Sequence, residues 1–166
     1  MVHRPHVQRP GPGQESVWDY PRPPRLEATS EHVVVEFAGR VVADTRRAIR
    51  VLETSHPPSY YLPHRDVDVS LLEIAAHRTW CEWKGEATYA DLVVGRRRSP
   101  LACWWYPSPA PAYAPLAGHI SFYPSRVDRA LVDGEEVRGS EGDFYGGWIT
   151  SRVVGPFKGA PGTAGW

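Results

Sequence analysis

This chain of 166 residues has no net charge and contains few cysteines and lysines. Its 19 Lys and Arg balance its 19 Asp and Glu, which gives a formal net charge of zero at pH 7. A neutral protein has no overall field to attract a nucleic acid or an anionic membrane surface, so we expect neither as a partner. The two cysteines cannot form a disulfide scaffold and lack the spacing of a zinc knuckle, so we expect no metal.

Long apolar runs and glycine-rich phosphate loops are also missing. No apolar run approaches the length of a membrane span, and the N-terminus lacks the apolar segment of a secretion signal. The patterns Gly-x-Gly-x-x-Gly and Gly-x4-Gly-Lys-Ser, which cradle phosphates, do not occur. We therefore expect a soluble cytoplasmic protein without a cofactor.

Lysine is rare because arginine supplies 17 of the 19 basic side chains. The two lysines, Lys84 and Lys158, each follow an aromatic residue and precede a glycine. An ammonium is a compact charge whose pKa shifts readily on burial, which a guanidinium cannot imitate. The pair is interpreted either as functional ammonium groups or as two remaining surface cations.

Proline is abundant, with 17 residues where average usage of about 5% gives roughly eight. Prolines crowd the first 25 positions, where Trp18 and Tyr20 are the large aromatic residues. These two side chains favour an arm packed on the domain, although a solvated linker is the alternative. The length predicts one domain. The predicted parts are a disordered tail at 1–15, the proline-rich arm at 16–30, the folded domain at 31–159 and a flexible tail at 160–166.

The folded part has the pattern of a β protein. Runs of β-branched residues surround Ala38-Gly39, and Asp133-Gly134 is a strong signal for a type I′ hairpin turn. Gly146-Gly147 predicts a bulge or a close backbone approach. About ten short strands with regular turn signals indicate a sandwich or an open barrel, with one helical turn at 68–76. The predicted fold class is mainly β, with little helix.

Aromatic residues concentrate between positions 80 and 148. Many tryptophans and tyrosines together favour the rim of a pocket, because their N–H and O–H groups need partners when they are buried. Filling of the hydrophobic core is the alternative. Alternation along the strand places Trp104 and Tyr106 on one face and Trp105 on the other.

The segment at 52–61 brings a carboxylate, two hydroxyls, an imidazole and two phenols close together in sequence. Glu53 and His56 could form an orienting carboxylate and a base, which is the pair that general acid–base catalysis requires. The alternative is a turn with a hydrogen-bonded surface histidine.

One acidic motif suggests a different activity. Asp66 and Asp68 form an Asp-x-Asp pattern that could hold Mg²⁺ on one strand face, as in many nucleotidyltransferases. The Gly-Ser turn that holds phosphate in those enzymes does not precede it.

Several separated motifs from Glu15 onward resemble one family. They include Cys81-x-Trp83-Lys84-Gly85, Phe144-Tyr145-Gly146-Gly147-Trp148 and Phe157-Lys158-Gly159. Together they are similar to the bacterial and fungal family called domain of unknown function 427. This resemblance implies a compact β-tent (Mss4-like) domain of two pleated antiparallel sheets meeting at an angle. Some members carry the label nucleotidyltransferase, and many β-tent proteins bind zinc through Cys-x-x-Cys pairs, which this chain lacks.

A further analogy concerns a tryptophan cage. The thalidomide-binding domain of cereblon resembles the β-tent architecture and binds its ligand in such a cage, which the analogy places at Trp83, Trp105 and Trp148 of this chain.

The first functional hypothesis is an aromatic-lined pocket that binds a small organic molecule, with catalysis left open. A nucleotidyltransferase using Asp66 and Asp68 is the second, and a peptide-binding module using the proline-rich arm is the third. The candidate catalytic residues are Glu53, His56 and Lys84. The candidate ligand-binding residues are Tyr61, Trp83, Trp105, Tyr145, Trp148 and Lys158.

Overall fold

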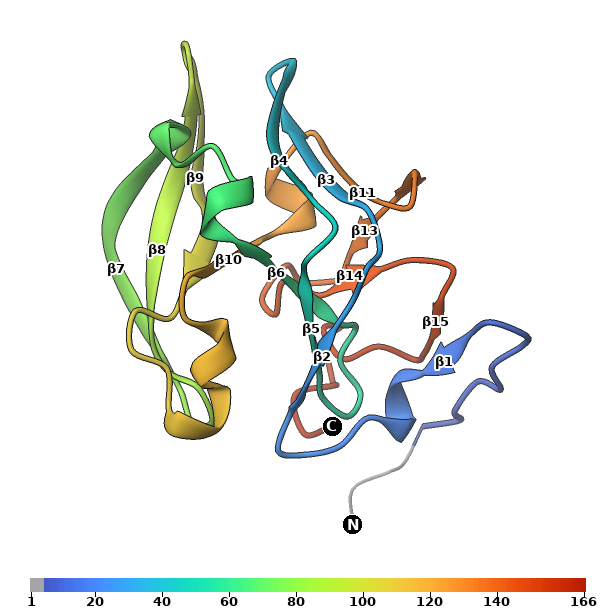
Figure 1. Ribbon diagram of the computed structural model, residues 1–166. Coiled ribbons are helices and arrows are strands. Elements are labelled where there is room, and N and C mark those ends of the chain that lie inside the picture. The colour runs from blue at the N-terminus through green and yellow to red at the C-terminus, as the bar shows by residue number, and fades with distance from the viewer. Residues whose placement is uncertain (1–4) are drawn as a thin grey trace.

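Two antiparallel sheets make up most of the computed structural model, which describes residues 5–166 (Figure 1). The larger sheet has seven strands in the order β2 (Arg25–Ala28), β5 (Ile49–Leu52), β6 (Ser59–Pro63), β10 (His119–Phe122), β9 (Arg97–Trp105), β8 (Gly85–Val94) and β7 (Leu72–Cys81). The smaller sheet has four, in the order β12 (Glu135–Glu136), β11 (Arg129–Val132), β3 (Val33–Phe37) and β4 (Arg40–Thr45).

Short elements complete the fold. Two further strand pairs are β1 (Glu15–Ser16) with β15 (Val153–Val154), which is parallel, and β13 (Arg138–Gly139) with β14 (Trp148–Ile149). The helical segments are single 3-10 turns or little more: η1 (Val17–Asp19), η2 (His64–Asp66), η3 (Val69–Leu71), η4 (Pro111–Leu116) and η5 (Pro124–Arg126). The predicted fold class, mainly β with little helix, is confirmed.

Two predicted hairpin turns form where the sequence places them. Ala38 and Gly39 have φ of 51° and 75°, and Asp133 and Gly134 have φ of 49° and 81°. A type I′ turn requires positive φ at both central residues, which glycine tolerates without steric cost. These turns join β3 to β4 and β11 to β12.

The predicted helical turn at 68–76 is mostly wrong. Only Val69–Leu71 is helical, and Leu72 begins the ten-residue edge strand β7. The pairing of β7 with β8 shifts between Ile74 and Arg78, which breaks the period of two that identifies a strand in a sequence. Most of β7 is also exposed, so it lacks the alternation of buried side chains.

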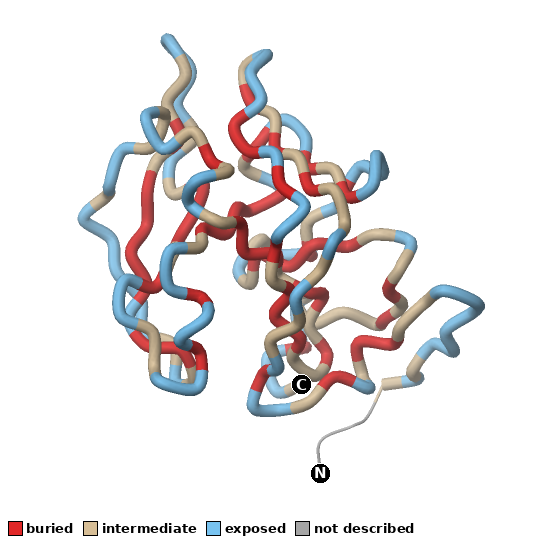
Figure 2. Tube along the Cα trace, in the orientation of Figure 1, coloured by how far each residue is buried: buried red, intermediate tan, exposed pale blue. Residues whose placement is uncertain are grey.

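The hydrophobic core lies where the four-stranded sheet packs on the centre of the larger one. Val33, Val35 and Phe37 alternate with less buried residues along β3 and point into this core. They meet side chains of β8, β9 and β10, of which Leu92 and Phe122 are fully buried. Figure 2 shows buried residues following the strands and exposed ones at the hairpin tips.

The N-terminal arm packs beside the C-terminal part of the chain. Gln8 and Gly155 exchange two hydrogen bonds, of 3.0 and 3.1 Å. Trp18 donates its indole N–H to the carbonyl of Pro156 at 2.8 Å, and its ring lies 5.4 Å from that of Trp166. Of the tail predicted at 1–15, residues 1–4 lie outside the described residues.

A buried arginine joins the arm to the larger sheet. Arg50 on β5 is fully buried and pairs with Glu15 of β1 at 2.8 Å and with Glu27 of β2 at 2.7 Å. A buried guanidinium needs such carboxylate partners, because its desolvation is otherwise uncompensated. This ion pair network fixes the arm beside the sheet that carries the cavity described next.

Candidate functional site

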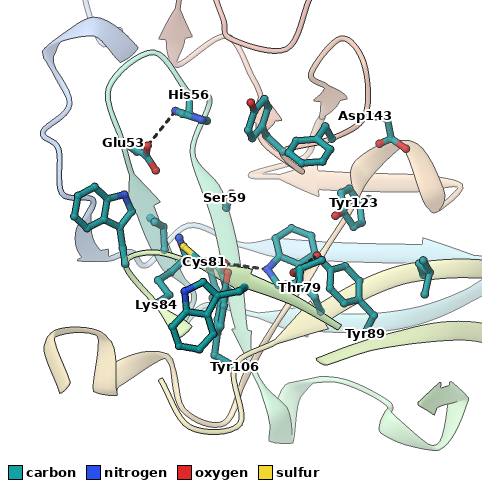
Figure 3. A pocket seen from close by; sticks show the side chains of 18 of the residues that line it. Glu53, His56, Ser59, Thr79, Cys81, Lys84, Tyr89, Tyr106, Tyr123 and Asp143 are labelled. Carbon is teal, nitrogen blue, oxygen red and sulfur yellow. Dashed lines mark hydrogen bonds and ion pairs between the residues drawn. The ribbon is translucent and has the colours of Figure 1, made fainter. Parts of the chain in front are cut away.

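A cavity of about 480 Å³ lies over one face of the larger sheet, and Figure 3 shows its lining. Strands β5 to β9 supply one part of the wall, and the segment at 143–145 together with Lys158 supplies another. Seven of the nine predicted site residues line it: Glu53, His56, Tyr61, Trp83, Lys84, Tyr145 and Lys158. The structure thus brings together groups that are up to about a hundred positions apart in the sequence.

The other two predicted residues, Trp105 and Trp148, lie elsewhere. Trp148 is fully buried in the core, where it donates its indole N–H to the carbonyl of Phe122 at 2.9 Å. Trp105 points to the opposite face of β9 from Trp104 and lines a separate cavity of about 220 Å³. Alternation along the strand explains this, and the tryptophan cage suggested by analogy is not assembled.

A tight hairpin positions Lys84 and Cys81. Strands β7 and β8 pair from Cys81 opposite Gly85, so residues 82–84 form the connecting loop. Gly85 has φ of 107°, a conformation that a side chain would strain. The carbonyl of Lys84 accepts a hydrogen bond from the backbone N–H of Ala110 at 3.0 Å, which ties the loop to the next segment.

The side chain of Lys84 is buried at the cavity wall. The residue is 8% exposed, and its ammonium lies 5.7 Å from the centre of the Tyr106 ring. Burial alone would lower its pKa, but Tyr61, Cys81 and Glu53 outweigh that effect and raise the pKa above its usual value. The Cys81 sulfur lies beside the ammonium (Figure 3). Lys84 is therefore a cation at neutral pH.

Phenols and an indole form the floor of the cavity. Tyr61 accepts a hydrogen bond from the indole N–H of Trp104 at 3.1 Å, and its ring stacks 6.3 Å from that of Tyr106. Burial raises the pKa of both Tyr61 and Tyr106. The two phenols therefore stay neutral and offer both ring surface and hydrogen bonds.

Glu53 and His56 stand together at one side of the cavity. The Nδ1 of His56 lies 3.0 Å from the carbonyl of Thr54 and 3.7 Å from Oε2 of Glu53. A carbonyl can only accept, so Nδ1 carries the hydrogen and Nε2 keeps its lone pair. Burial lowers the pKa of His56, and Lys158 and Arg22 act in the same direction against Glu53. The imidazole is therefore neutral at pH 7.

The second lysine lies next to this histidine. The Lys158 ammonium is 5.1 Å from the centre of the Tyr145 ring and 3.4 Å from the backbone oxygen of Trp166. The Tyr145 ring in turn meets the His56 ring edge to face at 4.9 Å. Both lysines of the chain therefore line one cavity.

Two of the three acidic groups of the wall already have cationic partners, and the third, Glu82, is exposed. Glu53 pairs with Arg22 at 3.3 Å as well as with His56, and Asp143 pairs with Arg126 at 2.9 Å. Among residues 5–166, every ion pair uses an arginine or a histidine and none uses a lysine. Neither ammonium group thus has an Asp or Glu partner within this part of the chain, and Lys158 donates instead to the backbone oxygen of Trp166.

Sequence reasoning missed several lining residues. Trp104 and Tyr106 were open to prediction, since alternation puts them on one face of their strand. For Cys81, the sequence suggests only a metal ligand or a disulfide partner. Thr79 and Tyr89 share a 2.9 Å hydrogen bond, and Arg126 lies 3.8 Å over the Tyr123 ring. Tyr89 and Tyr123 belong to the aromatic concentration at 80–148, whereas no local signal marks Thr79 and Arg126.

The Asp-x-Asp motif lies outside the cavity. Asp66 accepts hydrogen bonds from Thr45 at 2.7 Å and Arg47 at 3.2 Å, and Asp68 pairs with Arg40 at 3.3 Å. Across the residues that the structure describes, no three His, Cys, Asp or Glu side chains gather as a metal site.

Comparisons with known proteins connect the chain with one family. A family model described as domain of unknown function (DUF427), with the short name NTP_transf_9, matches residues 25–133. Comparison with curated proteins gives no match. The matched part includes Glu53, His56 and Lys84, whereas Tyr145 and Lys158 follow it in the sequence. Within 5–166, the helices are all too short to cross a membrane.

Proposed function

The chain belongs to the domain of unknown function 427 family, and from the geometry of the cavity we propose that this domain binds a small aromatic anion. The family description assigns no activity, so the proposal depends on the side chains of this chain. We also propose that its two main sheets form the β-tent arrangement and that it acts as a soluble cytoplasmic protein.

The two lysines carry the proposal. Lys84 and Lys158 line one cavity, and neither pairs with an Asp or Glu side chain among residues 5–166, while Glu53 and Asp143 are already paired. Burial costs the Lys84 ammonium part of its hydration, and a carboxylate or phosphate of a ligand would compensate for that desolvation through a charge-assisted hydrogen bond. The cavity therefore selects a negative charge.

The aromatic wall determines the other half of the ligand. Tyr61, Trp104 and Tyr106 present ring surface beside Lys84, and Trp83 lines the cavity from the same hairpin. Aromatic rings favour offset or edge-to-face contacts with a flat ligand and contribute about 0.5–1.5 kcal/mol beyond their buried area. A flat ring with an acidic substituent would contact the aromatic side chains and pair with the lysines.

Glu53 and His56 add the capacity to move a proton. His56 is neutral with a free Nε2, and Glu53 lies close enough to stabilise the imidazolium that forms when Nε2 accepts a proton. A ligand bound between Lys84 and Lys158 would lie next to this base. Binding is the first claim, and general-base catalysis on the bound ligand is the second.

A panel of ligand pairs tests the claim. Benzoate, phenylacetate and indole-3-acetate are each titrated beside their uncharged amides, with tryptophan fluorescence and the melting temperature as readouts. We expect the acids to bind and to raise the melting temperature, and the amides to bind at least about tenfold more weakly. Equal binding of acids and amides would refute the anion site.

Variants of the lysines give the matched control. Lys84→Met should lose acid binding. Lys84→Arg should also weaken it, because a larger planar guanidinium replaces a compact ammonium. Arg98→Met removes an exposed cation that pairs with Glu73 and Asp91 outside the cavity, so it should bind as the wild type does. A Lys84→Met protein that is folded and binds acids normally would contradict the assignment.

A further inference from the structure

The residue that the proposed function leaves unused is Cys81, whose thiol lines the same cavity. Cys81 ends β7 and Lys84 ends the following loop, so the hairpin holds the sulfur beside the ammonium (Figure 3). Cysteine is a strong nucleophile when its sulfur is accessible, and the Cys81 sulfur opens into the cavity. We propose that Cys81 is a nucleophile that bonds covalently to an α,β-unsaturated carbonyl compound bound in this cavity.

The second observation that points to a ligand is Lys84 itself. The residue is 8% exposed and lines the cavity, and among residues 5–166 its ammonium has the Cys81 sulfur as a hydrogen-bond partner but no oxygen or nitrogen. Three N–H donors are available there. One can remain directed to the Cys81 sulfur while another binds the carbonyl oxygen of the ligand.

The other cysteine shows what an unreactive thiol looks like in this fold. Cys103 is fully buried on β9, where burial raises the pKa of its thiol to about 12. Its sulfur lies 3.9 Å from the carbonyl of Ala90 and does not line the cavity. Cys81 is half-buried and lines the cavity, so Cys103 serves as an internal control for the reactivity of Cys81.

The reaction is an addition without a leaving group or a redox partner. The Cys81 sulfur attacks the β-carbon, a C–S bond forms, and the carbon–carbon π bond breaks. The electron pair moves toward the carbonyl oxygen, where the Lys84 ammonium stabilises the negative charge of the enolate. The proton that left the sulfur ends on the α-carbon, so the product has the combined mass of protein and ligand.

This inference rests on the proposed function only for the cavity and the role of Lys84. Aromatic acids could bind even if Cys81 were inert, and Cys81 could react even if such acids did not bind. The two ideas therefore fail independently, provided that binding and thiol modification are measured separately.

The first test compares two alkylating reagents of similar size on the native protein at pH 7. Iodoacetate carries a carboxylate and iodoacetamide does not, and peptide mass mapping assigns the label to Cys81 or Cys103. We expect Cys81 to react with iodoacetamide about tenfold faster than N-acetylcysteine does, and Cys103 to stay unlabelled. We expect iodoacetate to gain a further preference at Cys81 that is absent with N-acetylcysteine. A Cys81 rate below that of N-acetylcysteine with both reagents overturns the proposal.

The second test uses the proposed ligand class. Benzylideneacetone has a ring conjugated to an α,β-unsaturated ketone, and benzylacetone is its saturated counterpart. The intact mass should rise by one benzylideneacetone, at Cys81 alone, and should not change with benzylacetone. No adduct, or an adduct that persists in Cys81→Ser, overturns the proposal.

Lysine variants complete the design. Lys84→Met, checked for folding by its circular dichroism, should lose the fast rate and the preference for iodoacetate, whereas Arg98→Met should retain both. If Lys84→Met does not fold, Lys84→Gln keeps a polar group of similar length and makes the same prediction. Unchanged kinetics in the folded variant would overturn the role of the ammonium.

Discussion

The phenol of Tyr61 accepts the indole N–H of Trp104 at 3.1 Å, and this bond connects β6 to β9 across the intervening strand β10. Ser121 of β10 pairs with both residues in the sheet register, so the bond passes over it. The contact holds the floor of the cavity and orients both aromatic rings. It also makes the floor a measurable contributor to stability.

Tyr61→Phe should destabilise the protein by about 1–3 kcal/mol, because it leaves the buried N–H of Trp104 without an acceptor. Urea denaturation monitored by circular dichroism measures the free energy of unfolding. Tyr145→Phe is the control, since that phenol lines the cavity without a hydrogen bond in the described residues, and its effect should stay within about 0.5 kcal/mol. Equal effects of the two variants would show that the Tyr61–Trp104 bond contributes nothing.

Gly146 lets the backbone of the 143–147 segment approach the same indole. It has φ of 66°, and a Cβ at this position would lie 2.4 Å from Cη2 of Trp104. Gly146→Ala should therefore lower the free energy of unfolding by about 1–3 kcal/mol more than Gly118→Ala does. Gly118 has φ of 74° and nothing within 4 Å of an added Cβ, so it carries the backbone strain without the clash. Denaturant titration of both variants measures this difference. Equal losses in the free energy of unfolding would argue against close packing on Trp104.

The lowered pKa of His56 makes stability depend on pH. The unfolded chain holds more protons than the folded protein between the lowered pKa and the ordinary value of about 6.5, so the free energy of unfolding rises with pH in that window. The stabilisation is present above about pH 6.5 and is lost as the pH falls through the pKa of the folded state. Denaturation at a series of pH values should show this loss in the wild type and a smaller one in His56→Asn.

A second histidine serves as the control for this pH effect. The Nδ1 of His119 makes the same kind of local hydrogen bond, at 3.1 Å to the carbonyl of Ala117, but this half-buried histidine lies outside the cavity. His119→Asn should therefore keep the pH dependence of the wild type. A pH profile of His56→Asn that coincides with that of His119→Asn would contradict the assignment to His56.

The buried ion pairs of Arg50 should matter far more than exposed ones. The double variant Glu15→Gln and Glu27→Gln leaves a fully buried guanidinium without a carboxylate, which should cost about 3–5 kcal/mol. Arg98→Ala removes two surface ion pairs and should have a much smaller effect on stability. Thermal and urea denaturation of both proteins measure the difference, and a mild double variant would show that Arg50 is solvated.

The sequence predicts much of the fold because its turn residues act locally. Ala38-Gly39 and Asp133-Gly134 adopt positive φ, as predicted, and each joins two strands of the smaller sheet. Gly146-Gly147 forms the predicted close approach, because added side-chain atoms would collide with Trp104 and Pro57. The edge strand β7 was missed, since its bulge and its exposure erase the alternation that marks a strand.

Some features of the candidate site can likewise be predicted from the local sequence, whereas others depend on contacts between distant segments. The sequence alone singled out Lys84 and Lys158, because a chain that uses arginine nearly everywhere keeps only two ammonium groups. It could not show that both line one cavity, that Glu53 and Asp143 already have arginine partners, or that Trp105 and Trp148 lie elsewhere. Those facts depend on the strand order of the larger sheet and on the C-terminal segment that closes over it. Cys81 becomes a candidate nucleophile only there, where a hairpin holds its sulfur beside a buried ammonium facing an aromatic wall.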